Sequence, residues 1–127
     1  MTLLLDTHFL IWILLGSKRL RDYRWLERYR PWGVSPVSFL EIQFLAGVGR
    51  AEVRGPDLLE AVLADRRFLV DEVPLLHLVR QALAVSWTRD PFDRLLAAHS
   101  RARRLPLCSV DRRIREHHPL LPPELAG

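Results

Sequence analysis

Two aspartates follow apolar segments at opposite ends of this 127-residue chain, in positions where a strand would end. Asp6 comes directly after Leu3–Leu5, and Asp111 comes directly after the apolar segment 105–110. If both segments are strands of one parallel sheet, the two acids lie at its carboxyl edge, where such sheets bind ligands. Carboxylates that lie close together repel unless a cation binds between them, and oxygen ligands suit hard divalent cations. The pattern therefore predicts a divalent-metal site.

Glu41 is a third candidate, because it falls on an apolar helical face. At helical spacing, this face consists of Val37, Leu40, Phe44, Leu45 and Val48. An unpaired carboxylate on a buried face would be strongly destabilising or would take up a proton. Glu41 therefore needs a partner, and the sequence leaves two choices, an arginine or a metal ion.

A short turn supplies two more acids, Asp90 and Asp93. Asp90 is followed by a proline and then by an acid, a pattern typical of a helix start. Asp93 would lie in the first turn of that helix, where the helix dipole favours an anion. Asp6 and Asp111 could likewise be simple N-caps. Capping explains each aspartate alone, but four such acids in one small fold favour a metal.

The elements that would position these acids alternate along the chain. We expect strands at 3–5, 32–34, 68–73 and 106–110. We expect helices at 7–15, 21–29, 36–46, 56–65, 74–85 and 91–103, a last helical turn at 112–117 and an extended tail at 119–127. This order predicts an α/β protein with three layers (α/β/α) around a central parallel sheet of four to five strands.

The composition is that of a soluble single domain covering residues 1–127, with 49% hydrophobic and 27% charged residues. The single cysteine, Cys108, excludes an intrachain disulfide and is expected to be a small core residue. No basic segment precedes the apolar N-terminus, and Asp6 and His8 interrupt it well short of a membrane span. We therefore expect a cytoplasmic protein without a membrane segment.

The basic residues are almost all arginine. The formal net charge is +4, and Lys18 is the only lysine among 19 basic residues. Arginine binds phosphates through two parallel hydrogen bonds and stacks on bases, so a basic exterior around an acidic pocket suits an enzyme that acts on a polyanion. Genome composition is an equally good explanation of the arginine usage.

Four segments resemble the motifs of PIN-domain proteins, specifically the VapC-type toxins of bacterial toxin–antitoxin pairs. They are Leu4–Trp12 (LLDTHFLIW), Ser35–Ile42 (SPVSFLEI), Arg89–Ala98 (RDPFDRLLAA) and Leu105–Asp111 (LPLCSVD). Each motif is weak alone, but together they cover the chain in the family's order and spacing. Ser109 stands where threonine is commoner, a departure that removes no ligand.

The resemblance implies a metal-dependent endoribonuclease that cleaves RNA, often tRNA or ribosomal RNA, with Mg²⁺ or Mn²⁺ as cofactor. The family's metal-binding and catalytic acids fall on Asp6, Glu41, Asp93 and Asp111, with Thr7, Asp90 and Ser109 in support. Candidates for RNA binding are Arg89, Arg94, Arg112 and Arg113. The resemblance also implies a homodimer and a VapB-type antitoxin lying across the active-site face, for which Trp12, Trp25 and Trp32 are candidate groove residues.

Two other functions are alternatives to this one. A degenerate PIN domain would bind RNA or a protein partner without cleaving. A receiver-like signalling domain would need a lysine after the fifth strand, and Lys18 is in the wrong place. His8, His77 and His99 show no metal-ligand spacing and are interpreted as helix residues, whereas His117 and His118 are only weakly suggestive of a site.

Overall fold

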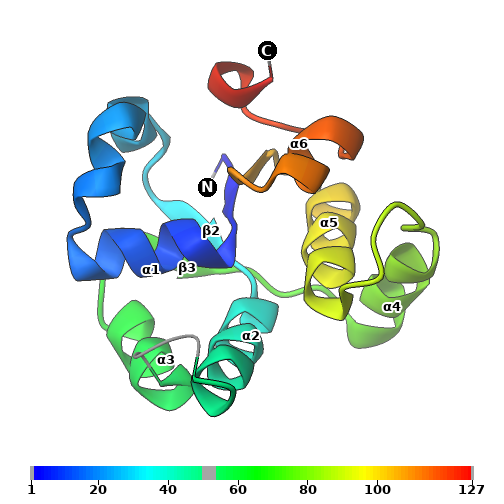
Figure 1. Ribbon diagram of the computed structural model, residues 1–127, viewed down its shortest axis with the longest axis horizontal. Coiled ribbons are helices and arrows are strands. Elements are labelled where there is room, and N and C mark those ends of the chain that lie inside the picture. Colours follow the sequence, from blue (N-terminus) through cyan, green and yellow to red (C-terminus); the bar gives the residue numbers. More distant parts are fainter. Residues whose placement is uncertain (1, 50–53, 127) are drawn as a thin grey trace.

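The computed structural model describes residues 2–49 and 54–126 (Figure 1). The strands are β1 (Leu4–Leu5), β2 (Trp32–Val34), β3 (Phe68–Val70) and β4 (Leu107–Cys108). The α-helices are α1 (Thr7–Leu15), α2 (Pro36–Gly47), α3 (Gly55–Leu63), α4 (Leu75–Leu83), α5 (Pro91–Arg103) and α6 (Arg112–His117). Two 3₁₀ segments complete the described chain, η1 (Lys18–Tyr29) and η2 (Pro123–Leu125).

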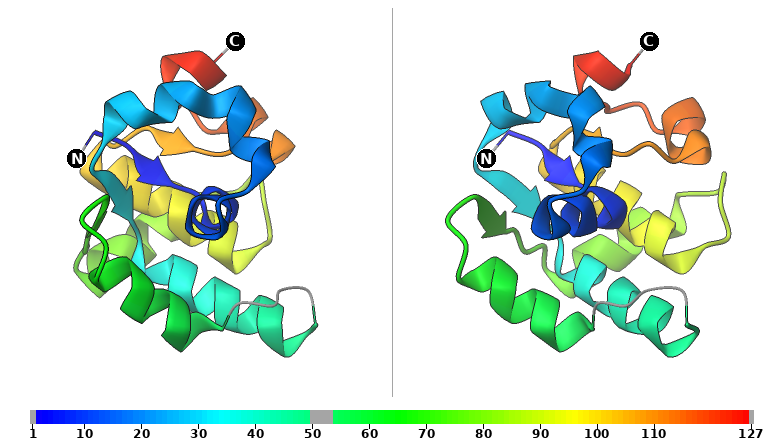
Figure 2. Two further views of the ribbon diagram at one scale, coloured as in Figure 1. Left: turned by 90° about the vertical axis from the view of Figure 1, so that its left-hand side faces the viewer. Right: turned by 60° about the vertical axis from the view of Figure 1, so that its left-hand side comes forward.

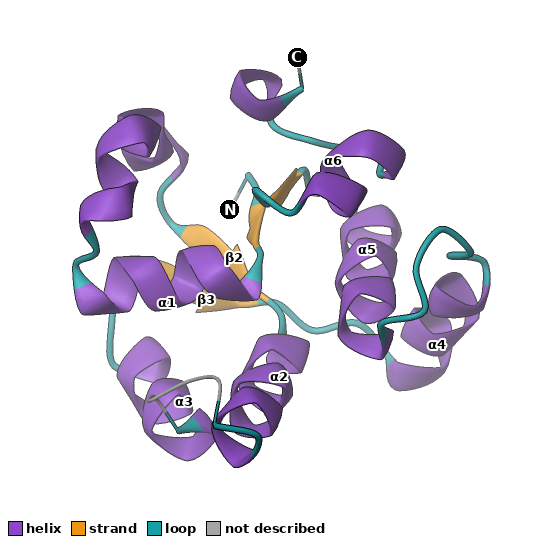
Figure 3. Ribbon diagram, in the orientation of Figure 1, coloured by secondary structure: helices purple, strands orange, loops and turns teal. Residues whose placement is uncertain are grey.

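The four strands form one parallel sheet in the order β3-β2-β1-β4. Leu4 of β1 lies opposite Gly33 of β2 on one side and Leu107 of β4 on the other. Figure 3 shows these strands inside the molecule with helices around them. The predicted α/β architecture with a parallel sheet is therefore confirmed.

Alternate residues of β1 belong to different hydrophobic clusters, because successive side chains of a strand point to opposite faces of the sheet. Leu3 and Leu5 pack in the larger cluster with residues of α1, α2 and α3. Leu4 packs with Leu107 and with residues of α5 and α6. Figures 1 and 2 show α2 beside α3 and α4 beside α5. The sheet is thus covered on both faces, as a buried parallel sheet requires.

Local signals set the helix ends. Gly16 adopts the left-handed conformation (φ 61°) that ends α1, and only glycine does so without strain. The Ser35 hydroxyl accepts the backbone N–H of Val37 and caps α2, as the Ser-Pro start predicts. The termini of α1, α5 and α6 follow Asp6, Asp90 and an aspartate after β4.

Several expectations about elements were wrong in detail. The strands expected at 3–5 and 106–110 are shorter, since β1 covers Leu4–Leu5 and β4 covers Leu107–Cys108. Strand β3 ends at Val70 rather than at residue 73, since the chain leaves the sheet once it is past its β2 partner. The expected helix 21–29 is a longer 3₁₀ segment, broken by non-helical dihedrals at Tyr23. The expected extended tail contains the 3₁₀ turn η2, in which Leu125 is buried against the core.

Cys108 is buried and free, consistent with its interpretation as a core residue. No helix within residues 2–49 and 54–126 combines the length and apolarity needed to cross a membrane.

Candidate active site

Adjacent parallel strands bring the first and last acidic motifs together. Because β1 pairs with β4, Asp6 and Asp111 emerge at the same edge of the sheet. The Ser109 hydroxyl donates a hydrogen bond to Asp6 Oδ2 (2.6 Å) and accepts one from the backbone N–H of Asp111 (3.0 Å). Asp6 Oδ1 also accepts the backbone N–H of Thr7 at 2.6 Å. These hydrogen bonds fix the Asp6 carboxylate and the backbone of Asp111, whose own Oδ1 accepts the backbone N–H of Ile114 at 3.1 Å.

Asp6 is almost completely buried, with 4% of its surface exposed. Burial raises the pKa of its carboxyl group, and the nearby charge of Asp111 raises it further, while the hydrogen bonds from Ser109 and Thr7 lower it. The net direction is upward. Asp6 therefore lies in a position where an added positive charge would be strongly favourable.

Glu41 is buried, but not for the reason its sequence position suggests. The inward residues of α2 are Ser38, Glu41 and Ile42. Leu40, Phe44 and Val48 were expected to be buried beside Glu41, yet each is more than half exposed. The expected apolar stripe was therefore wrong. Its other two members, Val37 and Leu45, are half-buried, and the fully buried face of α2 combines the polar Ser38 and Glu41 with Ile42.

The partner of Glu41 is a hydroxyl group. Thr7 Oγ1 donates a hydrogen bond to Glu41 Oε1 at 2.6 Å and lies 3.0 Å from the Ser38 hydroxyl. No ion pair formed within the described residues includes Glu41, so the arginine partner left open by the sequence is not found there. Burial raises the pKa of Glu41, and the charges of Asp6 and Asp90 raise it further.

The N-terminus of α5 presents the other two acids. Asp90 Oδ1 accepts the backbone N–H groups of Phe92 (2.8 Å) and Asp93 (3.1 Å), so Asp90 is the N-cap. Burial raises the pKa of Asp93 to about 7, and the charges of Asp90, Asp6, Asp111 and Glu41 act in the same direction. The fold thus brings the other four acids within electrostatic range of Asp93.

Three of these acids open into a hollow of about 490 Å³ at the end of the sheet. Its lining residues are Thr88, Asp90, Asp93, Asp111, Arg112, Arg113 and Glu116. Asp6 and Glu41 are not among them, and both are buried. The hollow is therefore acidic where α5 begins and mixed in charge along α6.

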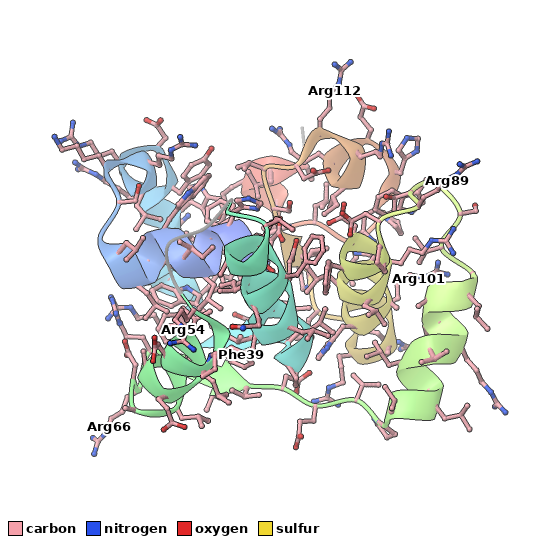
Figure 4. All side chains as sticks on the ribbon, turned by 60° about the horizontal axis from the view of Figure 1, so that its bottom comes forward. Phe39, Arg54, Arg66, Arg89, Arg101 and Arg112 are labelled. Atoms are coloured by element: carbon pink, nitrogen blue, oxygen red, sulfur yellow. The ribbon has the colours of Figure 1, made fainter. Side chains whose placement is uncertain are left out.

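The four candidate arginines differ in what they can do. Arg89 and Arg112 extend away from the ribbon in Figure 4, and Arg113 is also exposed. Arg112 forms an exposed ion pair with Glu116 on the same helix. Arg94 is half-buried, and its Nε donates to the backbone carbonyl of Thr88 at 2.7 Å. That bond ties Arg94 to the loop before α5. The guanidinium groups of Arg89, Arg112 and Arg113 are more exposed to solvent.

A family model described as PIN domain matches residues 3–118 of the chain. The chain belongs to the PIN-domain family. A comparison with curated proteins found no significant match. PIN domains are generally nucleases, and PIN-domain nucleases typically use divalent metals.

The acids of this PIN domain suit a divalent cation chemically. Carboxylate oxygens are hard ligands, and burial raises the pKa values of Asp6, Glu41 and Asp93, so a cation bound beside them would favour their ionised forms. Within the described residues, however, no three carboxylate, histidine or cysteine side chains form a ready metal-binding group. The donor set fits a metal by its chemistry, and the roles of the individual acids as ligands remain predictions.

Sequence reasoning missed a buried network behind these acids. His99, interpreted from the sequence as an ordinary helix residue, is fully buried. Its Nε2 lies 2.8 Å from Asp71 Oδ2, and its Nδ1 lies 3.0 Å from the Ser35 hydroxyl. Arg103 Nε also donates to Asp71, at 3.0 Å. The sequence signal for this burial is the group of small residues, alanines and a serine, on either side of His99.

The protonation of this network follows from its pKa shifts. Burial lowers the pKa of His99, although its hydrogen bond with Asp71 acts in the opposite direction. Burial raises the pKa of Asp71, but hydrogen bonds from His99 and Arg103 outweigh it, and the net direction is downward. We therefore assign a neutral imidazole that donates from Nε2 to an ionised Asp71 and accepts the Ser35 hydroxyl proton at Nδ1.

Proposed function

We propose that this PIN domain is a metal-dependent endoribonuclease and the toxin of a VapBC-type toxin–antitoxin pair. The observation that carries the proposal is the meeting of five acids at one sheet edge, where burial and mutual repulsion raise the pKa of Asp93 to about 7. Such a cluster favours a cation, and the arginines around it favour a polyanion. RNA as substrate rests on the resemblance to VapC-type toxins, and it would place the protein in the cytoplasm.

In this proposal Asp6, Glu41, Asp93 and Asp111 hold one or two Mg²⁺ or Mn²⁺ ions. A bound divalent ion supplies a nucleophilic water of lowered pKa and stabilises the leaving oxygen of a phosphodiester. Thr7 and Ser109 hold Glu41 and Asp6 in place through their hydroxyl groups.

Asp90 keeps the first turn of α5 in register, so that Asp93 faces the hollow. The exposed guanidinium groups of Arg89, Arg112 and Arg113 bind the phosphates of the RNA backbone.

The test is a cleavage assay on RNA with a titration of Mg²⁺ and Mn²⁺. Asp6→Asn, Glu41→Gln, Asp93→Asn and Asp111→Asn should each reduce cleavage at least about 100-fold, because each removes a charged ligand from a shared cation. Asp90→Asn should stay within about tenfold of wild type, since asparagine caps a helix nearly as well as aspartate. Asp57→Asn, in the exposed first turn of α3, is the matched control.

The pattern of activities distinguishes Asp90 from Asp93 as the third ligand, and a nuclease from a domain that only binds. Full activity of Asp93→Asn together with loss in Asp90→Asn would show that the third ligand is Asp90. No cleavage by the wild type at any metal concentration, with RNA still bound, would favour the second candidate, a PIN domain that binds RNA or a protein without cutting. That candidate is favoured by the lack of a ready three-residue metal group among the described residues.

The proposed homodimer and antitoxin are supported by exposed apolar side chains. Leu75, Leu76 and Leu83 of α4 are each more than 60% exposed, which is typical of a protein-binding surface. Trp32 cannot contribute to an antitoxin groove as expected, because it is 1% exposed and its indole N–H donates to the Leu26 carbonyl in the core. Light scattering of the purified protein, alone and with a candidate VapB-type antitoxin, measures both assemblies.

A further inference from the structure

The net positive charge of the protein is concentrated in residues 18–30, which comprise η1 and the arginine after it. This segment contains six basic and two acidic residues, so its formal charge of +4 equals that of the whole chain. The rest of the chain therefore has a formal charge of zero. All six basic residues of the segment are exposed. A general bias toward arginine would spread over the chain, so it does not explain this separation of charge.

Most of these cations have no acidic partner. Arg28 and Arg30 form ion pairs with Glu124 and Glu27. The other four basic residues enter no ion pair within residues 2–49 and 54–126, and they are Lys18, Arg19, Arg21 and Arg24. Lys18 and Arg21 share a face of η1, because residues three apart lie one above the other in a 3₁₀ helix. A bound polyanion would relieve the repulsion between these cations.

The acidic hollow contributes little attraction for a polyanion until a metal binds there. Its lining has two arginines and four carboxylates. The buried carboxylates of Asp6 and Glu41 also lie within electrostatic range of Asp93. These acids offset the charge of the neighbouring arginines, so the attraction of a polyanionic substrate must come from another part of the surface. The segment 18–30 supplies that charge.

Helix α1 connects the acids to this segment. Asp6 caps its N-terminus, and η1 begins two residues after Gly16, which ends it. The nine residues of α1 span about 14 Å and include no carboxylate. The Arg19 guanidinium lies 5.4 Å from the centre of the Trp12 ring of α1. Figure 1 shows η1 beyond the end of α1, with α5 on the other side of the strands. An extended polyanion can therefore reach from the acids along α1 to η1 without passing a carboxylate of this helix.

We infer that η1 is a second RNA-binding surface, which holds the phosphate backbone of the substrate outside the segment that is cleaved. Lys18, Arg21 and Arg24 contact phosphates, which carry no sequence information. A nucleic-acid backbone suits this surface better than an acidic protein does, because its phosphates recur along the chain and arginine binds each through two hydrogen bonds. The inference rests on the proposed function. It assigns affinity to η1 and chemistry to the acids, at least the length of α1 away.

The first test measures binding in chelator, so that cleavage plays no part. A fluorescently labelled RNA hairpin is titrated by anisotropy at a series of salt concentrations. The neutralised variant combines Lys18→Gln, Arg21→Gln and Arg24→Gln, three exposed positions. It should bind about 10- to 100-fold more weakly, and the slope of log affinity against log salt should fall by about two to three, because three phosphate contacts are lost.

Two matched variants separate the location of the charge from its amount and from packing. The control variant removes the same charge from exposed positions outside η1, and it combines Arg66→Gln, Arg80→Gln and Arg101→Gln. It should reduce the salt slope by less than about one. The charge-preserving variant of η1 combines Lys18→Arg, Arg21→Lys and Arg24→Lys. It should bind the hairpin within about threefold of wild type.

Cleavage kinetics then separate binding from chemistry. With Mg²⁺ at saturation, the neutralised variant should raise KM by about the factor lost in affinity and leave kcat within about twofold of wild type. A disturbance of the acids themselves would lower kcat instead.

Several results would overturn the inference. They are unchanged affinity and salt slope in the neutralised variant, an equal loss in the control variant, a loss in the charge-preserving variant, and a fall in kcat with unchanged KM. Polyglutamate that competes as well as unlabelled RNA at equal charge would also overturn it, in favour of an acidic protein segment as the occupant. RNA binding that depends on η1 without any cleavage would uphold this inference while refuting the proposed nuclease function.

Discussion

Three aspartates of the candidate site are the N-caps of helices. Asp6, Asp90 and Asp111 each accept a backbone N–H at the start of α1, α5 or α6. In Asp90 and Asp111 this bond uses Oδ1, and no hydrogen bond from a described residue reaches Oδ2. The N-cap bond therefore fixes the side chain while one oxygen remains free for a ligand. Capping and metal binding are compatible explanations of these residues.

At the same scale, His118 contributes to the change in the free energy of unfolding at acidic pH. His118 is 3% exposed, its Nε2 lies 2.8 Å from the Ser100 hydroxyl, and its Nδ1 has no partner among the described residues. Burial lowers its pKa to about 4, and the charge of Arg101 acts in the same direction. The neutral imidazole is therefore the form that the fold accepts.

We predict that His118 makes the protein lose stability as the pH falls from about 6.5 to 4. In this window the unfolded chain binds a proton at His118 and the folded chain does not, so acid favours unfolding. The lost stability is of the order of 2–3 kcal/mol. Denaturant unfolding at a series of pH values measures it. His118→Gln, which can still donate to Ser100, should lack this component, and an identical pH dependence in both proteins would contradict the assignment.

At the scale of elements, the buried network of His99 joins three parts of the fold. His99 belongs to α5, Ser35 caps α2, and Asp71 directly follows β3. The same two helices carry Asp93 and Glu41. The network therefore holds the two acid-bearing helices at a fixed separation.

We predict that His99→Leu destabilises the protein by about 2–4 kcal/mol, because it removes one of the two side-chain partners of the buried Asp71 and the acceptor of the buried Ser35 hydroxyl. Cleavage at saturating RNA should fall more than the apparent affinity for RNA, since α5 shifts relative to α2. His77→Leu is the matched control, because His77 is an exposed histidine on α4. It should change stability by less than about 0.5 kcal/mol. Equal effects of the two substitutions in denaturant melts would refute the role of the network.

At the scale of the whole molecule, the acids at the carboxyl edge of the sheet destabilise the folded state through their burial and mutual repulsion. The favourable packing of the rest of the domain outweighs this destabilisation. The raised pKa values of Asp6, Glu41 and Asp93 all have burial as their largest cause. A cation at this edge would bind the folded chain and not the unfolded one, and so would stabilise the fold as a whole.

We predict that Mg²⁺ or Mn²⁺ raises the melting temperature of the wild type. Metal at a hundred times its dissociation constant adds about 2.7 kcal/mol, which corresponds to several degrees for a domain of this size. Asp6→Asn should lose most of this response. It should melt no lower than wild type in chelator, because asparagine can still cap α1 and one source of repulsion is removed.

The same melting curves can also contradict this prediction. A wild type indifferent to metal, together with an Asp6→Asn variant several degrees less stable in chelator, would identify Asp6 as a structural cap alone.

Features decided by neighbouring residues were predictable from the sequence. The bounds of α1, β2 and α6 match the expected ranges, and Ser35 and Asp90 are the expected caps. The reason is that glycine, proline and capping side chains act within one turn of the chain. The parallel sheet was predictable as well, because strands that alternate with helices leave few other arrangements.

Features decided by distant residues required the tertiary structure. Helical periodicity locates a face of α2 but cannot tell whether that face meets the core, so Leu40 and Phe44 were wrongly expected to be buried. The bond from Thr7 to Glu41 joins residues 34 positions apart, and that from His99 to Asp71 joins residues 28 apart. The types and order of the acids were fixed by the sequence alone. The burial of Asp6, Glu41 and Asp93, which raises their pKa values, arose only in the tertiary structure, where α1, α2 and α5 pack at the strand ends.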